Sequence, residues 1–212
     1  MKESLVLIHG LWMTGAEMTL LRWRLSRCGF RTYQFRYHSL RRDLPANAWR
    51  LHRFLATVPG DRVHLVGHSL GGLVIRKLFQ QFPDQRPGRI VTLGTPHNAS
   101  AVAQHLRQSR FGRLLLGLSA KALCEDLPPW DGVRELGVIA GTRARGTGRL
   151  FGGLSGSNDG VVSVEETRLE NAADWIDLPI SHTGLVIAAV VAAETCHFLQ
   201  QGHFFRMRSA FS

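Results

Sequence analysis

Two kinds of apolar pattern alternate along the chain. Short apolar runs rich in β-branched residues are typical of buried strands, and apolar positions that recur every three or four residues indicate helices with one buried face. Strands are expected within residues 4–10, 31–37, 62–67, 89–96, 133–142 and 174–179. Helices are expected over residues 16–30, 46–60, about 70–81 and about 185–200. This order predicts an α/β fold in which about six mainly parallel strands form a sheet with helices on both faces.

Two segments interrupt the alternation. Residues 98–130 are too long for a simple connection and contain the apolar sequence FGRLLLGL at 111–118. Two interpretations stay open there: a helix that packs on the sheet, or a small cap that lines a substrate cleft. Residues 141–160 are rich in glycine, serine and arginine, which predicts a mobile loop. The chain has neither a repeat nor a linker, so a single domain over residues 1–212 is expected.

Composition is that of an ordinary globular protein, with 44% hydrophobic and 20% charged residues. No apolar run approaches the roughly 18 residues that span a bilayer. The apolar stretch after Met1 is too short for a secretory signal, so we expect a cytoplasmic protein that begins there. Three cysteines, Cys28, Cys124 and Cys196, lie far apart and predict reduced thiols, with neither a disulfide nor a zinc site.

The net charge of +10 adds one question about partners. The basic residues are almost all arginines and are scattered along the chain. No recognition helix, RNA-binding signature or lysine-rich run accompanies them, so no nucleic-acid partner is expected. Weak association with an anionic membrane surface stays open.

The strongest chemical signal is the sequence GHSLG at residues 67–71, which fits G-x-S-x-G. It lies between a predicted strand and a predicted helix, where a sharp turn exposes the side chain of Ser69. Gly67 and Gly71 suit this turn because strand and helix can approach closely only where side chains are absent. The start of the helix also directs free N–H groups toward the turn. We therefore predict that Ser69 is a nucleophile.

A serine nucleophile needs a base within hydrogen-bond reach, and the chain has 10 histidines. His182 is favoured because it follows the last predicted strand, at the same carboxyl edge of the sheet as Ser69. His97 also follows a strand end and stays open as an alternative. The other candidates lie inside predicted elements, or are expected to point away from the serine: His52, His64 and His68.

The base in turn needs an acidic partner that fixes its tautomer. Asp159 is favoured because it lies in a glycine-flanked turn after the fifth predicted strand and before His182. Three other aspartates stay open, although they lie beside strand cores or at the opposite sheet edge: Asp131, Asp174 and Asp177.

Acyl transfer also requires N–H donors for the oxyanion of the tetrahedral intermediate. The backbone N–H of Leu70 is the first candidate. The second is expected in the loop after the first strand, where His9 and Gly10 shape a turn that directs the N–H of Leu11 inward.

With these residues in place, the sequence resembles the α/β-hydrolases, and in particular small bacterial lipase- and esterase-like members related to triacylglycerol lipases and to the GPI-inositol-deacylase branch. The matching segments stand in the family's order: LVLIHGLW (5–12), GDRVHLVGHSLGGLVIR (60–76), VTLGTPH (91–97), SNDGVVSVEET (157–167) and SHTGL (181–185). The resemblance implies a minimal core without the leading antiparallel strands of larger members. It also implies that Ser69 is the nucleophile, Asp159 the acid, His182 the base, and Leu11 and Leu70 the oxyanion donors.

The expected function is therefore hydrolysis of carboxylic esters, of acyl or lipid type, through an acyl-enzyme intermediate. No metal or organic cofactor is implied. A thioesterase or acyltransferase with the same catalytic residues stays open, as does a catalytically silent binding protein with this fold.

Overall fold

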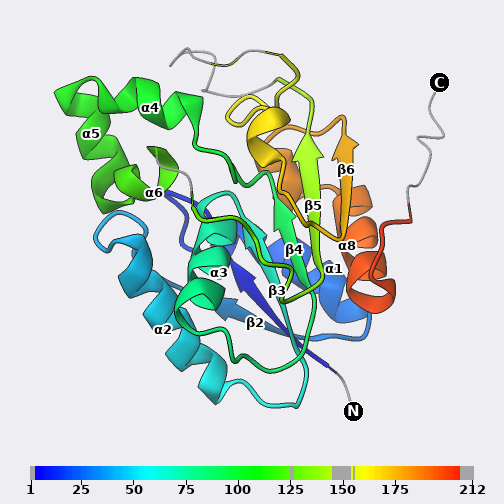
Figure 1. The fold of residues 1–212 in the computed structure, drawn as a ribbon. Helices are drawn as coiled ribbons and strands as arrows, with labels where there is room; N and C mark the ends of the chain where they lie inside the picture. Colours follow the sequence, from blue (N-terminus) through cyan, green and yellow to red (C-terminus); the bar gives the residue numbers. More distant parts are fainter. Residues whose placement is uncertain (1–2, 125–126, 145–153, 155, 206–212) are drawn as a thin grey trace.

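The computed structural model describes residues 3–124, 127–144, 154 and 156–205. Its centre is a six-stranded sheet in the order β2-β1-β3-β4-β5-β6 (Figure 1), and every neighbouring pair is parallel. The strands are β1 (Ser4–Ile8), β2 (Arg31–Phe35), β3 (Val63–His68), β4 (Ile90–Leu93), β5 (Leu136–Gly141) and β6 (Asp174–Leu178). The predicted α/β class and parallel sheet are confirmed.

Four helices of nine or more residues cover the sheet: α1 (Thr19–Arg27), α2 (Leu44–Thr57), α3 (Leu70–Gln81) and α8 (Ala189–Gln201). Side chains of α2 and α3 share one hydrophobic cluster with the sheet, and those of α1 and α8 share the other. In β1, Val6 and Ile8 enter the first cluster, whereas Leu5 and Leu7 enter the second. This alternation explains the unbroken apolar run, because a strand covered on both faces buries every side chain.

Short 3-10 turns replace the ends of two predicted helices. Residues Ala16–Met18 form such a turn before α1, and Thr183–Val186 form another between β6 and α8. The helix α2 begins where Asp43 accepts a hydrogen bond from the N–H of Ala46 at 2.9 Å, which satisfies one free donor of the first turn.

The segment 98–130 contains three short helices instead of one: α4 (Ala101–Arg107), α5 (Arg110–Leu116) and α6 (Ala120–Cys124). Ser100 and Ser109 cap the first two, because their hydroxyl groups accept hydrogen bonds from N–H groups three residues later. In Figure 1, α4 and α5 lie toward the end of the sheet at which the strand arrows point. Of the loop predicted at 141–160, residues 145–153 and 155 lie outside the described residues.

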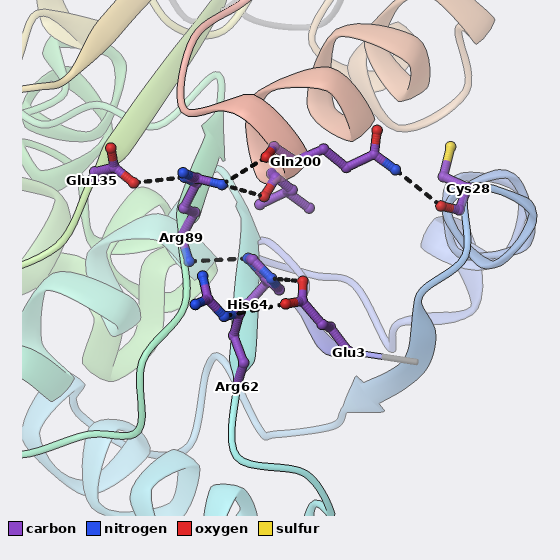
Figure 2. Close-up of polar contacts among 8 residues, drawn as sticks. Glu3, Cys28, Arg62, His64, Arg89, Glu135 and Gln200 are labelled. Atoms are coloured by element: carbon purple, nitrogen blue, oxygen red, sulfur yellow. Dashed lines mark hydrogen bonds and ion pairs between the residues drawn. The ribbon is translucent and has the colours of Figure 1, made fainter. Parts of the chain in front are cut away.

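Polar contacts join the strands at the opposite, amino-terminal edge of the sheet (Figure 2). The ring of His64 is fully buried, and its Nε2 lies 2.9 Å from Oε2 of Glu3. Its Nδ1 accepts a hydrogen bond from the backbone N–H of Arg89 at 3.0 Å, so the proton of the neutral ring is on Nε2. Arg89 also contacts Glu135 at 2.6 Å, which ties the starts of β4 and β5 together. None of the helices in the described ranges is both long and apolar enough to cross a membrane.

Candidate active site

Ser69 lies in the turn between β3 and α3, with a φ of 52° and a ψ of −122°. L-residues rarely adopt a positive φ, and such strain is concentrated at functional sites. Two close approaches require glycines beside the turn. A Cβ atom on Gly71 would lie 2.3 Å from the backbone oxygen of Ile8, and one on Gly67 would lie 2.7 Å from the backbone nitrogen of Gly72. Neither position can hold a side chain without movement of the backbone.

Asp159 and His182 form a buried hydrogen-bonded pair at the same edge of the sheet. Nδ1 of His182 lies 2.7 Å from Oδ2 of Asp159. The other carboxylate oxygen accepts hydrogen bonds from the N–H groups of Val161 and Val162, at 2.9 and 2.8 Å. The backbone N–H of His182 also donates to the carbonyl oxygen of Asp159 at 3.0 Å. Because an ionised carboxylate can only accept, Nδ1 carries the proton and Nε2 can accept one.

A cleft of about 350 Å³ brings the serine and the histidine together. Ser69 and His182 both line it, and Asp159 lies behind His182. Within the described residues, the Ser69 hydroxyl has no hydrogen-bond partner. Most of the remaining wall is apolar and includes side chains from all three helices of the segment 98–130: Val102, Ala103, Leu106, Leu116 and Leu123.

The loop after β1 forms another part of the wall and contacts that segment, because Nε1 of Trp12 donates a hydrogen bond to the carbonyl oxygen of Leu115 at 2.8 Å. Leu11 lines the cleft, and Gly10 lies so close to the serine that an added Cβ atom would be 3.1 Å from Cβ of Ser69. Trp12 has a φ of 60°, so the turn that His9 and Gly10 begin is strained as well. Neither the N–H of Leu11 nor that of Leu70, the first residue of α3, donates a hydrogen bond to another described residue.

The alternative bases and acids lie elsewhere. His97 is buried between Thr92 Oγ1, 3.1 Å from its Nε2, and the guanidinium group of Arg76. His97 is not among the described residues that line the cleft. The carboxylate of Asp131 accepts a hydrogen bond from the N–H of Val133, that of Asp174 accepts from Phe204, and Asp177 is exposed on β6.

His68 contributes to the site in a way that the sequence analysis missed. It lines the cleft beside Ser69, and its Nε2 lies 3.1 Å from the carbonyl oxygen of His182. The two imidazole rings are 4.7 Å apart. Burial, and then the electrostatic interaction with His182, lower the pKa of His68 well below its ordinary value, so the His68 ring is neutral and donates to that carbonyl. Only its position directly before the serine could have indicated this contact.

Glu166 was also missed. Its buried carboxylate accepts hydrogen bonds from the N–H groups of Ser163 and Ala101. It therefore joins the loop of Asp159 to the start of α4, and burial raises its pKa. Among the described residues, no group of three or more histidine, cysteine, aspartate or glutamate side chains could hold a metal ion.

Stability should fall in mild acid, because burial lowers the pKa of four histidines below the ordinary value of 6.5: His9, His64, His68 and His97. Below about pH 6.5 the unfolded chain then binds more protons than the folded chain, so the free energy of unfolding decreases as the pH falls. Each histidine contributes up to about 1.4 kcal/mol per pH unit. The midpoint of thermal unfolding should therefore drop between about pH 7 and pH 5.

The matched variants are His64→Gln, which removes one buried ring, and His105→Gln, which removes an exposed one. The first should flatten the dependence of the midpoint on pH, and the second should leave it unchanged. A wild-type midpoint that stays constant over this range would contradict the prediction.

Comparison with known proteins places this arrangement in a family. The sequence model of the family described as "alpha/beta hydrolase fold" matches residues 4–116. None of the curated proteins compared with the chain matches it.

Similar solved structures include the Bacillus licheniformis lipase BlEst2 in mature form, with 22% sequence identity, a TM-score of 0.76, and coverage of 95% of this chain and 92% of that chain. The metagenomic carboxyl esterase MGS0156 has 17% identity and a TM-score of 0.68, with coverage of 85% and 64%. A pyrethroid hydrolase from Sphingobium faniae JZ-2 has 17% identity and a TM-score of 0.66, with coverage of 95% and 98%. At these identities the likeness shows the fold. Because the family model covers more than half of its 212 residues, the chain belongs to the α/β-hydrolase fold family.

Proposed function

We propose that the protein is a serine hydrolase that cleaves carboxylic esters. The observation that carries the proposal is the 2.7 Å pair of Asp159 and His182, buried behind a cleft that a strained, unpartnered serine also lines. The pair leaves Nε2 of His182 as the base. The names of similar structures, a lipase and a carboxyl esterase, support the same class of reaction.

In the proposed reaction, Oγ of Ser69 attacks the acyl carbon of the ester and its proton passes to Nε2 of His182. The oxyanion accepts hydrogen bonds from the N–H groups of Leu11 and Leu70, which are free to donate in the described structure. His182 then protonates the leaving alcohol, and Asp159 stabilises the imidazolium. A water molecule, deprotonated by His182, releases the acid from the acyl-enzyme. Hydrogen bonds between nucleophile and base often tighten only when substrate binds, which suits the absent contact between Ser69 and His182.

The acyl portion is proposed to occupy the apolar side of the cleft. Helices α4, α5 and α6 supply that side, so we interpret the segment 98–130 as a cap over the substrate. A straight hydrocarbon chain gains about 0.8 kcal/mol for each buried CH₂ group. The kcat/KM for p-nitrophenyl esters should therefore increase with acyl length until the chain fills the apolar side of the cleft.

Labelling with a fluorophosphonate tests the nucleophile directly. One equivalent should attach to the native protein, and digestion followed by mass spectrometry should locate the adduct on the peptide that contains Ser69. Heat-unfolded protein is the control and should not react, because the reagent needs the activated hydroxyl. An adduct on another serine, or none while esters are hydrolysed, would overturn the assignment.

A further inference from the structure

A second pocket, of about 470 Å³, lies between the loop after β1 and the loop after β2. Strand order explains its position, because β2 neighbours β1, and β1 neighbours the strand that ends at Ser69. Trp12 and Met13 line both this pocket and the catalytic cleft. Because these two residues belong to both linings, the two spaces adjoin each other at the loop after β1.

The second pocket differs from the catalytic cleft in charge. Arg36, His38 and Arg41 line it, and no acidic side chain does. Neither arginine has an ion pair with any residue that the structure describes. Two arginines elsewhere do have ion pairs among the described residues: Arg62 with Glu3 and Arg89 with Glu135 (Figure 2). Hence Arg36 and Arg41 have no acidic partner among the residues that the structure describes.

Glu17, in the 3-10 turn before α1, is not among the described residues that line this pocket. Glu17 lines the catalytic cleft instead, and its carboxylate accepts hydrogen bonds from the N–H groups of Thr14 and Gly15 at 3.1 and 3.0 Å. These bonds help to lower the pKa of Glu17, whose carboxylate is therefore held in place by the backbone.

We propose that this basic pocket binds a phosphate group on the leaving portion of the substrate, while the acyl chain occupies the apolar cleft. The inference rests on the proposed ester hydrolysis. Guanidinium groups suit phosphate because their planar N–H donors form paired, charge-assisted hydrogen bonds with its oxygens. The shared chemistry is an acyl group joined to a phosphorylated alcohol or thiol. Two sources supply it: an acylglycerol phosphate, or an acyl-coenzyme A thioester.

Two matched substrate pairs test the proposal, each with one acyl chain and with or without phosphate. The first compares an acylglycerol phosphate with the corresponding monoacylglycerol, and the second compares S-acyl-4′-phosphopantetheine, the phosphorylated arm of acyl-coenzyme A, with S-acylpantetheine. Short acyl chains keep all four compounds below their micelle concentrations. We expect kcat/KM to be at least about tenfold higher for the phosphorylated member of at least one pair, since hydrogen bonds to charged groups have this size. The pair that shows the preference identifies the source.

The double variant Arg36→Gln/Arg41→Gln should reduce this preference about tenfold or more, and 0.5 M salt should reduce it in the wild type. Arg42→Gln is the matched control, because Arg42 is an exposed neighbour outside the pocket lining. The single variants Arg36→Gln and Arg41→Gln change the net charge by the same amount as Arg42→Gln; each should lower the preference, whereas Arg42→Gln should keep it. Thermal unfolding of each variant verifies that it is folded.

The outcomes separate this inference from the proposed function. Equal rates within both pairs, a preference that survives in the double variant, or the same loss in Arg42→Gln would each overturn the phosphate pocket. In those cases, Ser69-dependent hydrolysis of the neutral compounds would leave the proposed function standing. Hydrolysis that persists undiminished in Ser69→Ala would instead overturn the proposed function.

Discussion

Ester turnover should fall by about 10⁵- to 10⁶-fold when Ser69 is replaced by alanine. The replacement removes the only atom proposed to bond to the acyl carbon, so no acyl-enzyme can form. The fold should survive, because the hydroxyl has no hydrogen-bond partner among the described residues and faces the cleft. Steady-state kinetics with a p-nitrophenyl ester measures the loss, and circular dichroism with thermal unfolding verifies the fold.

Ser100→Ala is the matched control for this experiment. Ser100 lines the same cleft and loses the same hydroxyl, but its role is to cap α4. Its replacement should cost about 1 kcal/mol of stability and change turnover far less than Ser69→Ala. If Ser69→Ala retained more than about one hundredth of the wild-type turnover, Ser69 would not be the nucleophile.

Replacing Asp159 by asparagine should lower turnover about 10⁴-fold with little change in shape. In the wild type, one carboxylate oxygen accepts from two backbone N–H groups and the other accepts from Nδ1 of His182. An asparagine oxygen will keep the two backbone contacts, so its NH₂ group will face Nδ1. That group donates, which requires the imidazole proton to move to Nε2, and the base can then no longer accept the serine proton.

Comparison with Asp177→Asn tests whether the effect is specific. Asp177 was one of the alternative acids, and it is exposed on β6. Its replacement should leave turnover within about twofold, as expected for a surface position. A large loss of turnover in Asp177→Asn, or near-normal turnover in Asp159→Asn, would show that Asp159 is not the catalytic acid.

The sheet was predictable from the sequence because burial on both faces leaves an unambiguous pattern. The run at residues 5–8 is apolar without interruption, and its side chains do enter both hydrophobic clusters. The turn at Ser69 was also predictable, because position 71 must be glycine: an added Cβ there would lie 2.3 Å from the backbone oxygen of Ile8. These features depend on local residue types, which a sequence displays directly.

The remaining features depend on contacts between distant segments. The described part of residues 98–130 contains the short helices α4, α5 and α6, and each has seven residues or fewer, too few for a periodic pattern to define. The contact between His68 and the carbonyl oxygen of His182 spans the sheet edge, and no spacing rule predicts it. The charge of the second pocket likewise arises because two loops meet, so neither loop indicates it alone.

Two hydrogen bonds join Asp159 and His182, one between their side chains at 2.7 Å and one between their backbones at 3.0 Å. These two bonds tie the loops that carry the two residues to each other. In the proposed mechanism, a shift of either loop would move the acid and the base together, so their mutual alignment would depend little on where the substrate places the serine turn.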